Sequence, residues 1–182
     1  MRGQFLVQMA GTSAAGKSTL AAAIGRATGA VVIDKDIIKG GMLDGGVPEE
    51  IAGPTAYEVL FDLAGSVLAQ GFSVVMDSPA FFDRIRDIGR EMVLANGACY
   101  YIVRCVLHDI EELQRRMDAR AVRSSQPVVA ALESYDRPGT SPLTEPHVVI
   151  NMSRSLDVSL KRALDYIGRP VPDLVAARHG QG

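Results

Sequence analysis

The sequence has no tryptophan, only two cysteines and no large excess of charge of either sign. The formal net charge is -2 at pH 7, so the composition lacks the basic excess that nucleic acids or anionic membranes attract. No apolar run approaches the roughly 18 residues that a membrane-spanning helix needs. The short polar start before the first apolar run does not resemble a signal peptide. We therefore expect a cytoplasmic protein that does not associate with membranes.

The few cysteines and histidines do not predict a disulfide or a metal site. Cys99 and Cys105 lie in one apolar run, and their even separation places both on the same face of a strand. Strand residues that far apart are beyond the reach of a disulfide, so we expect two buried thiols. His108, His147 and His179 match no metal-ligand spacing.

The 182 residues fit one domain, in which short apolar segments alternate with segments of helical periodicity. We expect one domain over 1–168, a flexible tail over 169–182, and a mobile glycine-rich segment over 40–48. Such alternation predicts an α/β fold, a five-stranded parallel sheet covered by helices on both faces. The predicted strands cover 5–10, 30–33, 72–76, 98–107 and 147–150, and the predicted helices cover 17–28, 55–70, 83–95, 110–120, 128–135 and 155–167.

Residues 11–18 read G-x-x-x-x-G-K-S, the P-loop or Walker A pattern, between a predicted strand and a predicted helix. Glycines let the backbone curl so that its N–H groups cradle phosphates, and the helix adds its positive N-terminus. In this pattern Lys17 neutralises the β- and γ-phosphates and Ser18 ligates Mg²⁺, so we expect ATP and Mg²⁺ as cofactors. The predicted ATP-binding residues of this segment are Gly11, Thr12, Ser13, Ala14, Ala15, Gly16, Lys17, Ser18 and Thr19.

Acidic residues follow the second and third predicted strands. In a parallel sheet these strand ends meet at the edge where ligands bind. Asp34 or Asp36 can accept the proton of an attacking hydroxyl, but either one can instead cap the following helix. Asp77 ends an apolar strand, as does the acid that holds Mg²⁺ in a Walker B segment. The alternative is a turn aspartate before Ser78 and Pro79.

A basic helix follows the fourth predicted strand. Arg116 and Arg120 are four residues apart and share one face. Arginines can bridge the oxygens of a transferring phosphoryl group, although a solvated basic face is the more common meaning of such a run. We expect both arginines in a small helical lid over about 109–127.

With these motifs, the chain resembles the P-loop kinase-like phosphotransferases, in particular the kinase domain of polynucleotide kinase and chloramphenicol phosphotransferase. The resemblance covers about 4–167 and implies a P-loop NTPase three-layer sandwich. It favours Asp36 over Asp34 as the catalytic base, because Asp36 and Met42 keep an aspartate-to-methionine spacing of the second family. It also places Lys39 where the first family has a substrate-phosphate arginine, and it matches Arg116 and Arg120 to a lid that grips ATP.

Two departures weaken the similarity to polynucleotide kinase. Asp34 replaces an asparagine of that family's pattern, and Lys39 replaces an arginine, which removes a two-pronged phosphate contact. The sequence therefore favours a kinase for a hydroxyl of a small molecule, such as an antibiotic, a nucleoside or a sugar. The expected acceptor pocket comes from 40–57, including Tyr57, with Phe81 and Phe82 either as an apolar wall or, as is more common for such residues, in the core.

Two other functions stay open at this stage. One is a polynucleotide 5′-hydroxyl kinase, which the charge balance disfavours. The other is a non-catalytic nucleotide-binding module. A GTPase is disfavoured because no N-K-x-D motif occurs. An AAA+ or transporter ATPase is disfavoured by the small size and by the lack of a recognisable sensor or signature motif.

Overall fold

The computed structural model describes residues 3–120 and 142–168. Its central sheet has five strands in the order β2-β3-β1-β4-β5, and every neighbouring pair is parallel. This confirms the predicted five-stranded parallel sheet. The strands are β1 (Phe5–Ala10), β2 (Val31–Asp34), β3 (Val74–Asp77), β4 (Cys99–Val106) and β5 (His147–Asn151).

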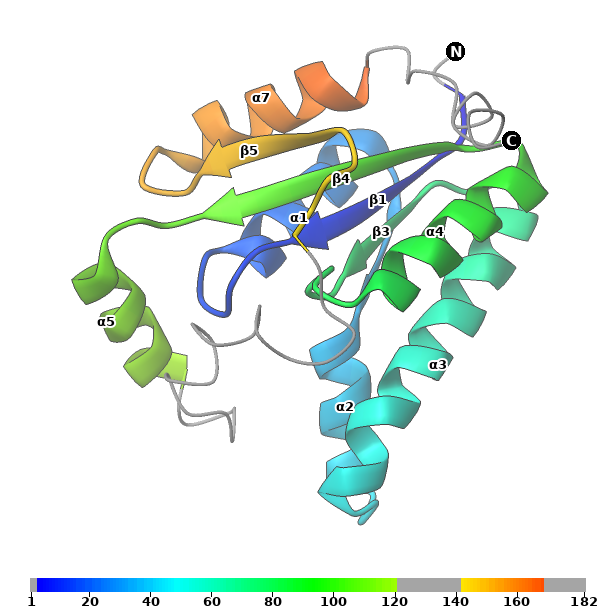
Figure 1. Cartoon of the computed structure of the whole chain (residues 1–182), viewed down its shortest axis with the longest axis horizontal. Helices are drawn as coiled ribbons and strands as arrows, with labels where there is room; N and C mark the ends of the chain where they lie inside the picture. The colour runs from blue at the N-terminus through cyan, green and yellow to red at the C-terminus, as the bar shows by residue number, and fades with distance from the viewer. Residues whose placement is uncertain (1–2, 121–141, 169–182) are drawn as a thin grey trace.

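Helices cover both faces of the sheet, so the predicted three-layer α/β architecture is also confirmed (Figure 1). One face packs against α1 and α7, and the other packs against α3 and α4. The helix α5 stands beyond the carboxyl end of β4 (Figure 1). The described helices are α1 (Lys17–Thr28), α2 (Lys35–Asp44), α3 (Glu49–Ala69), α4 (Asp83–Asn96), α5 (Ile110–Arg120) and α7 (Leu156–Ile167).

The strand β1 lies at the centre of the sheet and is buried along its whole length. Its side chains alternate between the two hydrophobic clusters, with Val7 in the cluster of α1 and α7 and Leu6 in the cluster of α3 and α4. Cys99 and Cys105 both contact the first cluster as free thiols, but only Cys105 is buried, and Cys99 is half-buried, which corrects the expectation of two buried thiols. Their predicted common face is therefore confirmed. A central strand this well buried holds the loop that follows it in a fixed position.

Residues 40–44 of the glycine-rich segment belong to α2, so this part of the segment expected to be mobile is helical. Asp34 caps α2 by accepting a hydrogen bond of 2.7 Å from the backbone N–H of Asp36. The helix then packs beside α3, and Lys39 of α2 forms a 2.8 Å ion pair with Glu49 of α3. Capping and tertiary contact here outweigh the low helix propensity of glycine.

The helix α3 begins at Glu49, six residues earlier than predicted, and it contains Pro54 in its second turn. Proline lacks an N–H and therefore suggests a helix boundary, which is why the sequence placed the start after it. Pro48 is the N-cap, and its carbonyl accepts the N–H groups of Ile51 and Ala52. The first turn therefore forms upstream of the proline.

Three expectations lie outside the described residues: the helix over 128–135, the lid residues 121–127 and the tail over 169–182. In the part of the chain that the structure describes, no helix has both the length and the apolar character needed to cross a membrane.

Candidate active site

The loop after β1 adopts a strongly curved backbone that its glycines permit. Gly11 has φ 121°, and a Cβ placed there would lie 2.1 Å from the carbonyl oxygen of Cys105 on the neighbouring strand β4. Gly16 has φ 92°, and Ala14 also has a positive φ of 60°. Successive backbone turns of this kind make a concave nest of N–H groups that suits phosphate. The predicted phosphate cradle therefore has the backbone geometry that its function needs.

Lys17 and Thr12 connect the two ends of this loop. Lys17 is the first residue of α1, and its Nζ donates a hydrogen bond of 2.8 Å to the carbonyl of Thr12. The ammonium group is thereby held over the curved backbone. At this position it can balance the charge of a phosphate that the loop binds.

Ser18 and Asp77 bring a hydroxyl and a carboxylate together at the carboxyl edge of the sheet. Asp77 is buried, and the Ser18 hydroxyl lies close enough to lower the pKa of its carboxyl. Burial raises the pKa of Asp77, and the nearby charges of Asp34 and Asp36 act in the same direction, while Ser18 and Lys17 oppose them. A divalent cation placed here would relieve the repulsion among these carboxylates.

These oxygen donors fit a Mg²⁺ ion that completes its shell with phosphate and water better than they fit a metal ion held by protein side chains alone. Within 3–120 and 142–168, no group of three or more His, Cys, Asp or Glu side chains could hold a metal ion. Magnesium in phosphoryl-transfer sites commonly uses one or two protein oxygens and completes its shell with phosphate oxygens and water. Ser18 and Asp77 meet that requirement.

The two aspartates after β2 have different surroundings. One side-chain oxygen of Asp34 caps α2, and Asp34 pairs in register with Asp77 across β2 and β3. The side chain of Asp36 is 70% exposed, and its Oδ1 lies 2.8 Å from Nζ of Lys35. Asp36 lines the large cavity of the molecule. The helix-cap role therefore belongs to Asp34, and Asp36 presents its carboxylate to the cavity.

Lys35 is a buried cation that sequence reasoning did not single out. Its side chain is 9% exposed, and its Nζ lies 5.4 Å from the ring centroid of Tyr57. Burial raises the pKa of the Tyr57 phenol, and the charge of Asp36 raises it further. These three residues form one compact group, in which Lys35 holds the Asp36 carboxylate beside an aromatic ring.

The helix α5 packs directly on the P-loop. Its residues Leu113 and Met117 form a small apolar cluster with Ala14 of the loop. Arg116 lines the same large cavity, and its Nε donates a hydrogen bond of 2.7 Å to Glu112. The predicted arginine at 116 is therefore beside the nucleotide loop, and the side chain of Arg120 lies outside the described residues.

A cavity of about 990 Å³ gathers these groups at the carboxyl edge of the sheet. It is bounded on one side by the P-loop and α5 and on the other side by α2, α3 and the segment after β3. The predicted site residues that line it are Ser13, Ala14, Gly16, Lys17, Ser18, Thr19, Asp36, Lys39, Tyr57, Asp77 and Arg116.

Four other predicted site residues do not line the cavity but shape the backbone around it. Gly11 provides the turn, the carbonyl of Thr12 holds Lys17, the N–H of Ala15 donates to that same carbonyl at 3.3 Å, and Asp34 caps α2. The segment 40–57 was expected to form the acceptor pocket. Of its residues, the cavity is lined by three near its C-terminal end, Gly53, Pro54 and Tyr57.

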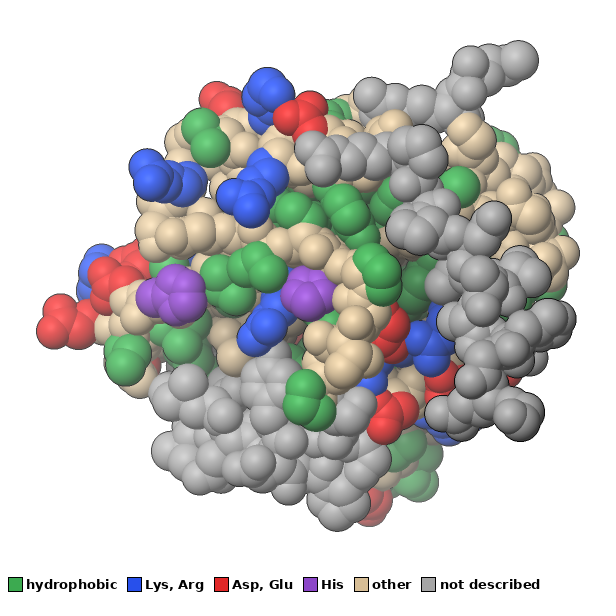
Figure 2. Space-filling model, turned by 45° about the horizontal axis from the view of Figure 1, so that its top comes forward, with side chains coloured by type: hydrophobic (Ala, Val, Ile, Leu, Met, Phe, Trp, Pro, Cys, Tyr) green, Lys and Arg blue, Asp and Glu red, His purple; other side chains and the backbone are tan. Residues whose placement is uncertain are grey.

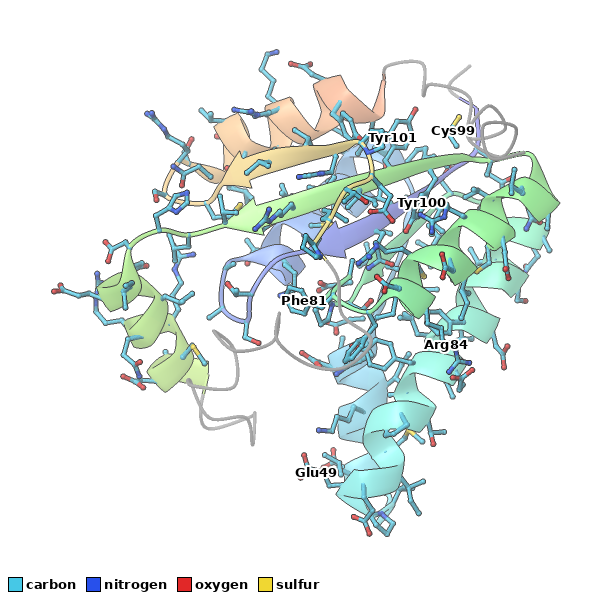
Figure 3. The ribbon with its side chains drawn as sticks, viewed as in Figure 1. Glu49, Phe81, Arg84, Cys99, Tyr100 and Tyr101 are labelled. Atoms are coloured by element: carbon cyan, nitrogen blue, oxygen red, sulfur yellow. The ribbon has the colours of Figure 1, made fainter. Side chains whose placement is uncertain are left out.

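Several cavity residues were missed by sequence reasoning. Phe61 belongs to the core cluster of α3 and α4 and also lines the cavity. Glu58 and Arg84 are joined by an ion pair of 2.8 Å between α3 and α4, and Figure 3 shows Arg84 between these two helices. Arg154 follows β5, so the rule that ligands lie beyond strand ends could have found it. No sequence pattern pairs Glu58 with Arg84.

Charged side chains are dispersed on the face that Figure 2 shows. Lysine and arginine side chains stand singly there and alternate with acidic ones over α7 and β5. A nucleic-acid backbone needs a continuous basic track. The described residues of this face do not provide one.

Comparison with known proteins supports the same fold. Residues 6–137 match the model of a family described as AAA domain. The name of this family refers to the AAA group. An AAA+ ATPase was among the functions that the sequence disfavoured. No curated protein sequence matches the chain.

Several of the solved structures that match are described as kinases. A candidate kinase from Chloroflexus aurantiacus J-10-fl is 20% identical with a TM-score of 0.73, over 93% of this chain and 100% of that one. A gluconokinase from Sinorhizobium meliloti 1021 is 23% identical with a TM-score of 0.63, over 98% and 100%. The APS kinase CysC of Mycobacterium tuberculosis, in complex with AMPPNP and APS, is 19% identical with a TM-score of 0.66, over 92% and 99%. At these identities the likeness establishes the P-loop kinase fold.

Proposed function

We propose that this chain, which belongs to the AAA domain family and has a P-loop kinase fold, is an ATP-dependent phosphotransferase that phosphorylates a hydroxyl of a small molecule. One observation carries the proposal. The Asp36 carboxylate and the Lys17–Ser18–Asp77 group line a single cavity from two sides. A nucleotide-binding module needs the second group but has no use for the first.

Each residue has a distinct role in this proposal. The nest formed by 11–16 binds the phosphates of ATP, and Lys17 and Arg116 stabilise negative charge that develops on the γ-phosphoryl group. Asp36 accepts the proton of the acceptor hydroxyl and orients its oxygen toward that group. Tyr57 and Lys39 lie on the acceptor side of the cavity.

Ser18 and Asp77 would hold Mg²⁺ in this site. When bound with ATP, the ion supplies positive charge to the phosphate oxygens. The Ser18 hydroxyl and the Asp77 carboxylate lie close to each other, so both oxygens are within reach of one cation. The protein contribution is this arrangement of oxygens.

The structural neighbours support a small-molecule acceptor. Their names describe kinases for gluconate, for sugars and for APS. All of these acceptors are smaller than a nucleic-acid strand, and a cavity of about 990 Å³ suits such a molecule together with a nucleotide.

The decisive test is the substitution Asp36→Asn. We expect nucleotide affinity within about two-fold of the parent protein and phosphoryl transfer reduced by about 100-fold or more, in line with general-base magnitudes. Labelled ATP with a panel of hydroxyl compounds measures transfer, and calorimetry measures affinity. Asp44→Asn, at the exposed end of the same helix, is the matched control and should leave both values unchanged. Near-normal turnover by Asp36→Asn would exclude Asp36 as the base.

A further inference from the structure

The acceptor side of the cavity is rich in aromatic side chains. The chain has five phenylalanines, five tyrosines and no tryptophan, and four of these ten rings line this one side: Tyr57, Phe61, Phe81 and Phe82. They come from α3 and from the segment between β3 and α4. Figure 3 shows Phe81 at the carboxyl end of β3. Such a concentration in a chain poor in aromatics calls for a reason beyond core packing.

Two of the four rings are only partly buried in the hydrophobic core. Phe61 and Phe81 are 8% and 7% exposed, so packing accounts for them. Tyr57 and Phe82 are only half-buried, and they meet edge to face with their centroids 6.5 Å apart and an interplanar angle of 80°. Their remaining surface faces the cavity that they line. An edge-to-face pair with open surface is a favourable neighbour for a third ring.

The cations on the same side are each paired with a carboxylate of this chain. Lys35 pairs with Asp36, Lys39 with Glu49, and Arg84 with Glu58, all at 2.8 Å. An acceptor that carried a carboxylate, sulfate or phosphate would meet cations whose charge is already balanced, so it would gain little from them. A charge in a partly enclosed cavity without its own partner is costly. The described acceptor side is therefore matched to a neutral molecule.

The aromatic pair lies directly beside the carboxylate of the proposed base. Asp36 is close enough to Tyr57 for its charge to raise the pKa of the phenol, after the larger effect of burial. Lys35 contacts both, with Asp36 at 2.8 Å and the ring of Tyr57 at 5.4 Å. A ring packed against Tyr57 and Phe82 would thus bring a hydroxyl one or two bonds away within reach of Asp36.

We infer that the acceptor is an uncharged alcohol with a flat aromatic body, whose ring packs on Tyr57 and Phe82 and whose hydroxyl points to Asp36. This inference rests on the proposed function, because it identifies the chemical class that the same site accepts. It separates this chain from its structural neighbours, whose names include kinases for the anions gluconate and APS.

Matched probes test the inference on the full chain. The protein is saturated with Mg²⁺ and AMPPNP, and binding is measured by NMR titration with 4-(hydroxymethyl)benzamide, 4-(hydroxymethyl)benzoate, glucose and gluconate. The first two have nearly the same shape and differ in charge, and the last two lack an aromatic ring. We expect the benzamide to bind at least about five-fold more tightly than each of the other three. Tighter binding of the benzoate, glucose or gluconate, or no binding of the benzamide, overturns the inference.

A pair of variants locates the ring contact. Phe82→Leu keeps an apolar side chain but removes the aromatic face, and we expect it to weaken benzamide binding about five-fold. Phe72→Leu is the control, because Phe72 is 54% exposed and does not line the cavity. Equal effects of the two variants overturn the inference. Thermal unfolding of each variant verifies that it is folded.

Transfer from ATP to the same four compounds is measured separately. Binding of the benzamide with no phosphoryl transfer to any compound retains the acceptor class and contradicts the proposed kinase function. Transfer to glucose or gluconate, with no binding of the benzamide, retains the kinase function and contradicts the acceptor class. The two failures are therefore distinguishable.

Discussion

Ser18 lies beside Asp77, close enough for its hydroxyl to lower the pKa of that carboxyl, and this contact joins the first turn of α1 to the carboxyl end of β3. The strands that lead to these residues, β1 and β3, are hydrogen-bonded neighbours. A long stretch of chain separates the two residues, yet parallel pairing places both at one edge of the sheet. The contact gives the proposed Mg²⁺ site its position before any ligand binds.

Asp77→Asn should separate stability from cation binding. Since burial raises the folded-state pKa of Asp77, the favourable contribution of this group is present below its unfolded pKa and is lost as pH rises through the folded value. The neutral amide avoids that loss. We expect the ligand-free variant to be at least as stable as the parent at pH 7 to 8, with the difference shrinking on acidification.

The same variant should bind Mg²⁺–ATP at least about ten-fold more weakly, because one oxygen charge is removed. Thermal unfolding with and without Mg²⁺–ATP measures both effects. Asp62→Asn, on the exposed side of α3, is the control and should change neither. A marked loss of ligand-free stability in Asp77→Asn at pH 8 would contradict this account of the buried carboxylate.

Lys35→Met should affect turnover more than nucleotide affinity. The substitution removes the cation that lies 2.8 Å from Asp36 and over the ring of Tyr57. Without it the Asp36 carboxylate loses its fixed position, and we expect kcat to fall about ten-fold or more with the KM for ATP within two-fold. Steady-state kinetics with a saturating acceptor measures both constants.

Lys35→Arg should recover part of the lost rate, because it restores the charge. Lys161→Met is a matched control, since Lys161 pairs with Asp165 at 2.6 Å on an exposed helix face. A proportional rise in the KM for ATP in Lys35→Met would show instead that Lys35 serves the nucleotide.

Glu145→Gln should destabilise the fold. Glu145 accepts hydrogen bonds from Nε of Arg86 at 2.9 Å and from Nη1 of Arg90 at 2.7 Å, and Arg86 is 3% exposed. Removing the carboxylate charge leaves the buried Arg86 guanidinium paired with Asp83 but without the charge of Glu145, and we expect a loss of about 1–3 kcal/mol in the free energy of unfolding. Denaturant unfolding measures it, with the exposed Glu111→Gln expected within about 0.5 kcal/mol of the parent.

The effect of Glu145→Gln should depend on pH. Burial pushes the pKa of Glu145 up, but its backbone hydrogen bond and the contacts with Arg90 and Arg86 together lower it. The stability that it contributes is present above its unfolded pKa and is lost as pH falls through the folded value. The gap between variant and parent should therefore narrow in acid, and a gap that widens there would contradict the assigned role.

Gly41→Ala should stabilise the protein by about 0.5–1 kcal/mol, because alanine is the better helix former and loses less chain entropy. Gly41 lies inside α2, and a Cβ built there meets no atom within 4 Å. Gly97→Ala is the opposite case, since Gly97 has φ 61° at the end of α4, and it should destabilise. Thermal unfolding distinguishes the two. Destabilisation by Gly41→Ala would favour the loop that the sequence suggested.

Local patterns determined most of the architecture. Each predicted strand of the sheet exists, because an apolar run between turn residues has few alternatives to a buried strand. The motif at 11–18 specified a phosphate loop, because its backbone needs glycine at Gly11 and Gly16 for reasons that lie within the loop and its neighbouring strand. The error over α2 shows the limit, since a cap and a packed neighbour decided that helix.

Only the tertiary structure decided the roles of individual side chains at the site. Asp34 and Asp36 have similar neighbours in the sequence, and their different roles come from the helix cap at Asp34 and from the position of Lys35 beside Asp36. Tyr57, Phe61, Phe81 and Phe82 belong to two separate segments, so their convergence on one cavity wall follows from how α3 packs on the sheet. Sequence periodicity reports which residues share a face of one element, whereas a site is made by faces of different elements that meet.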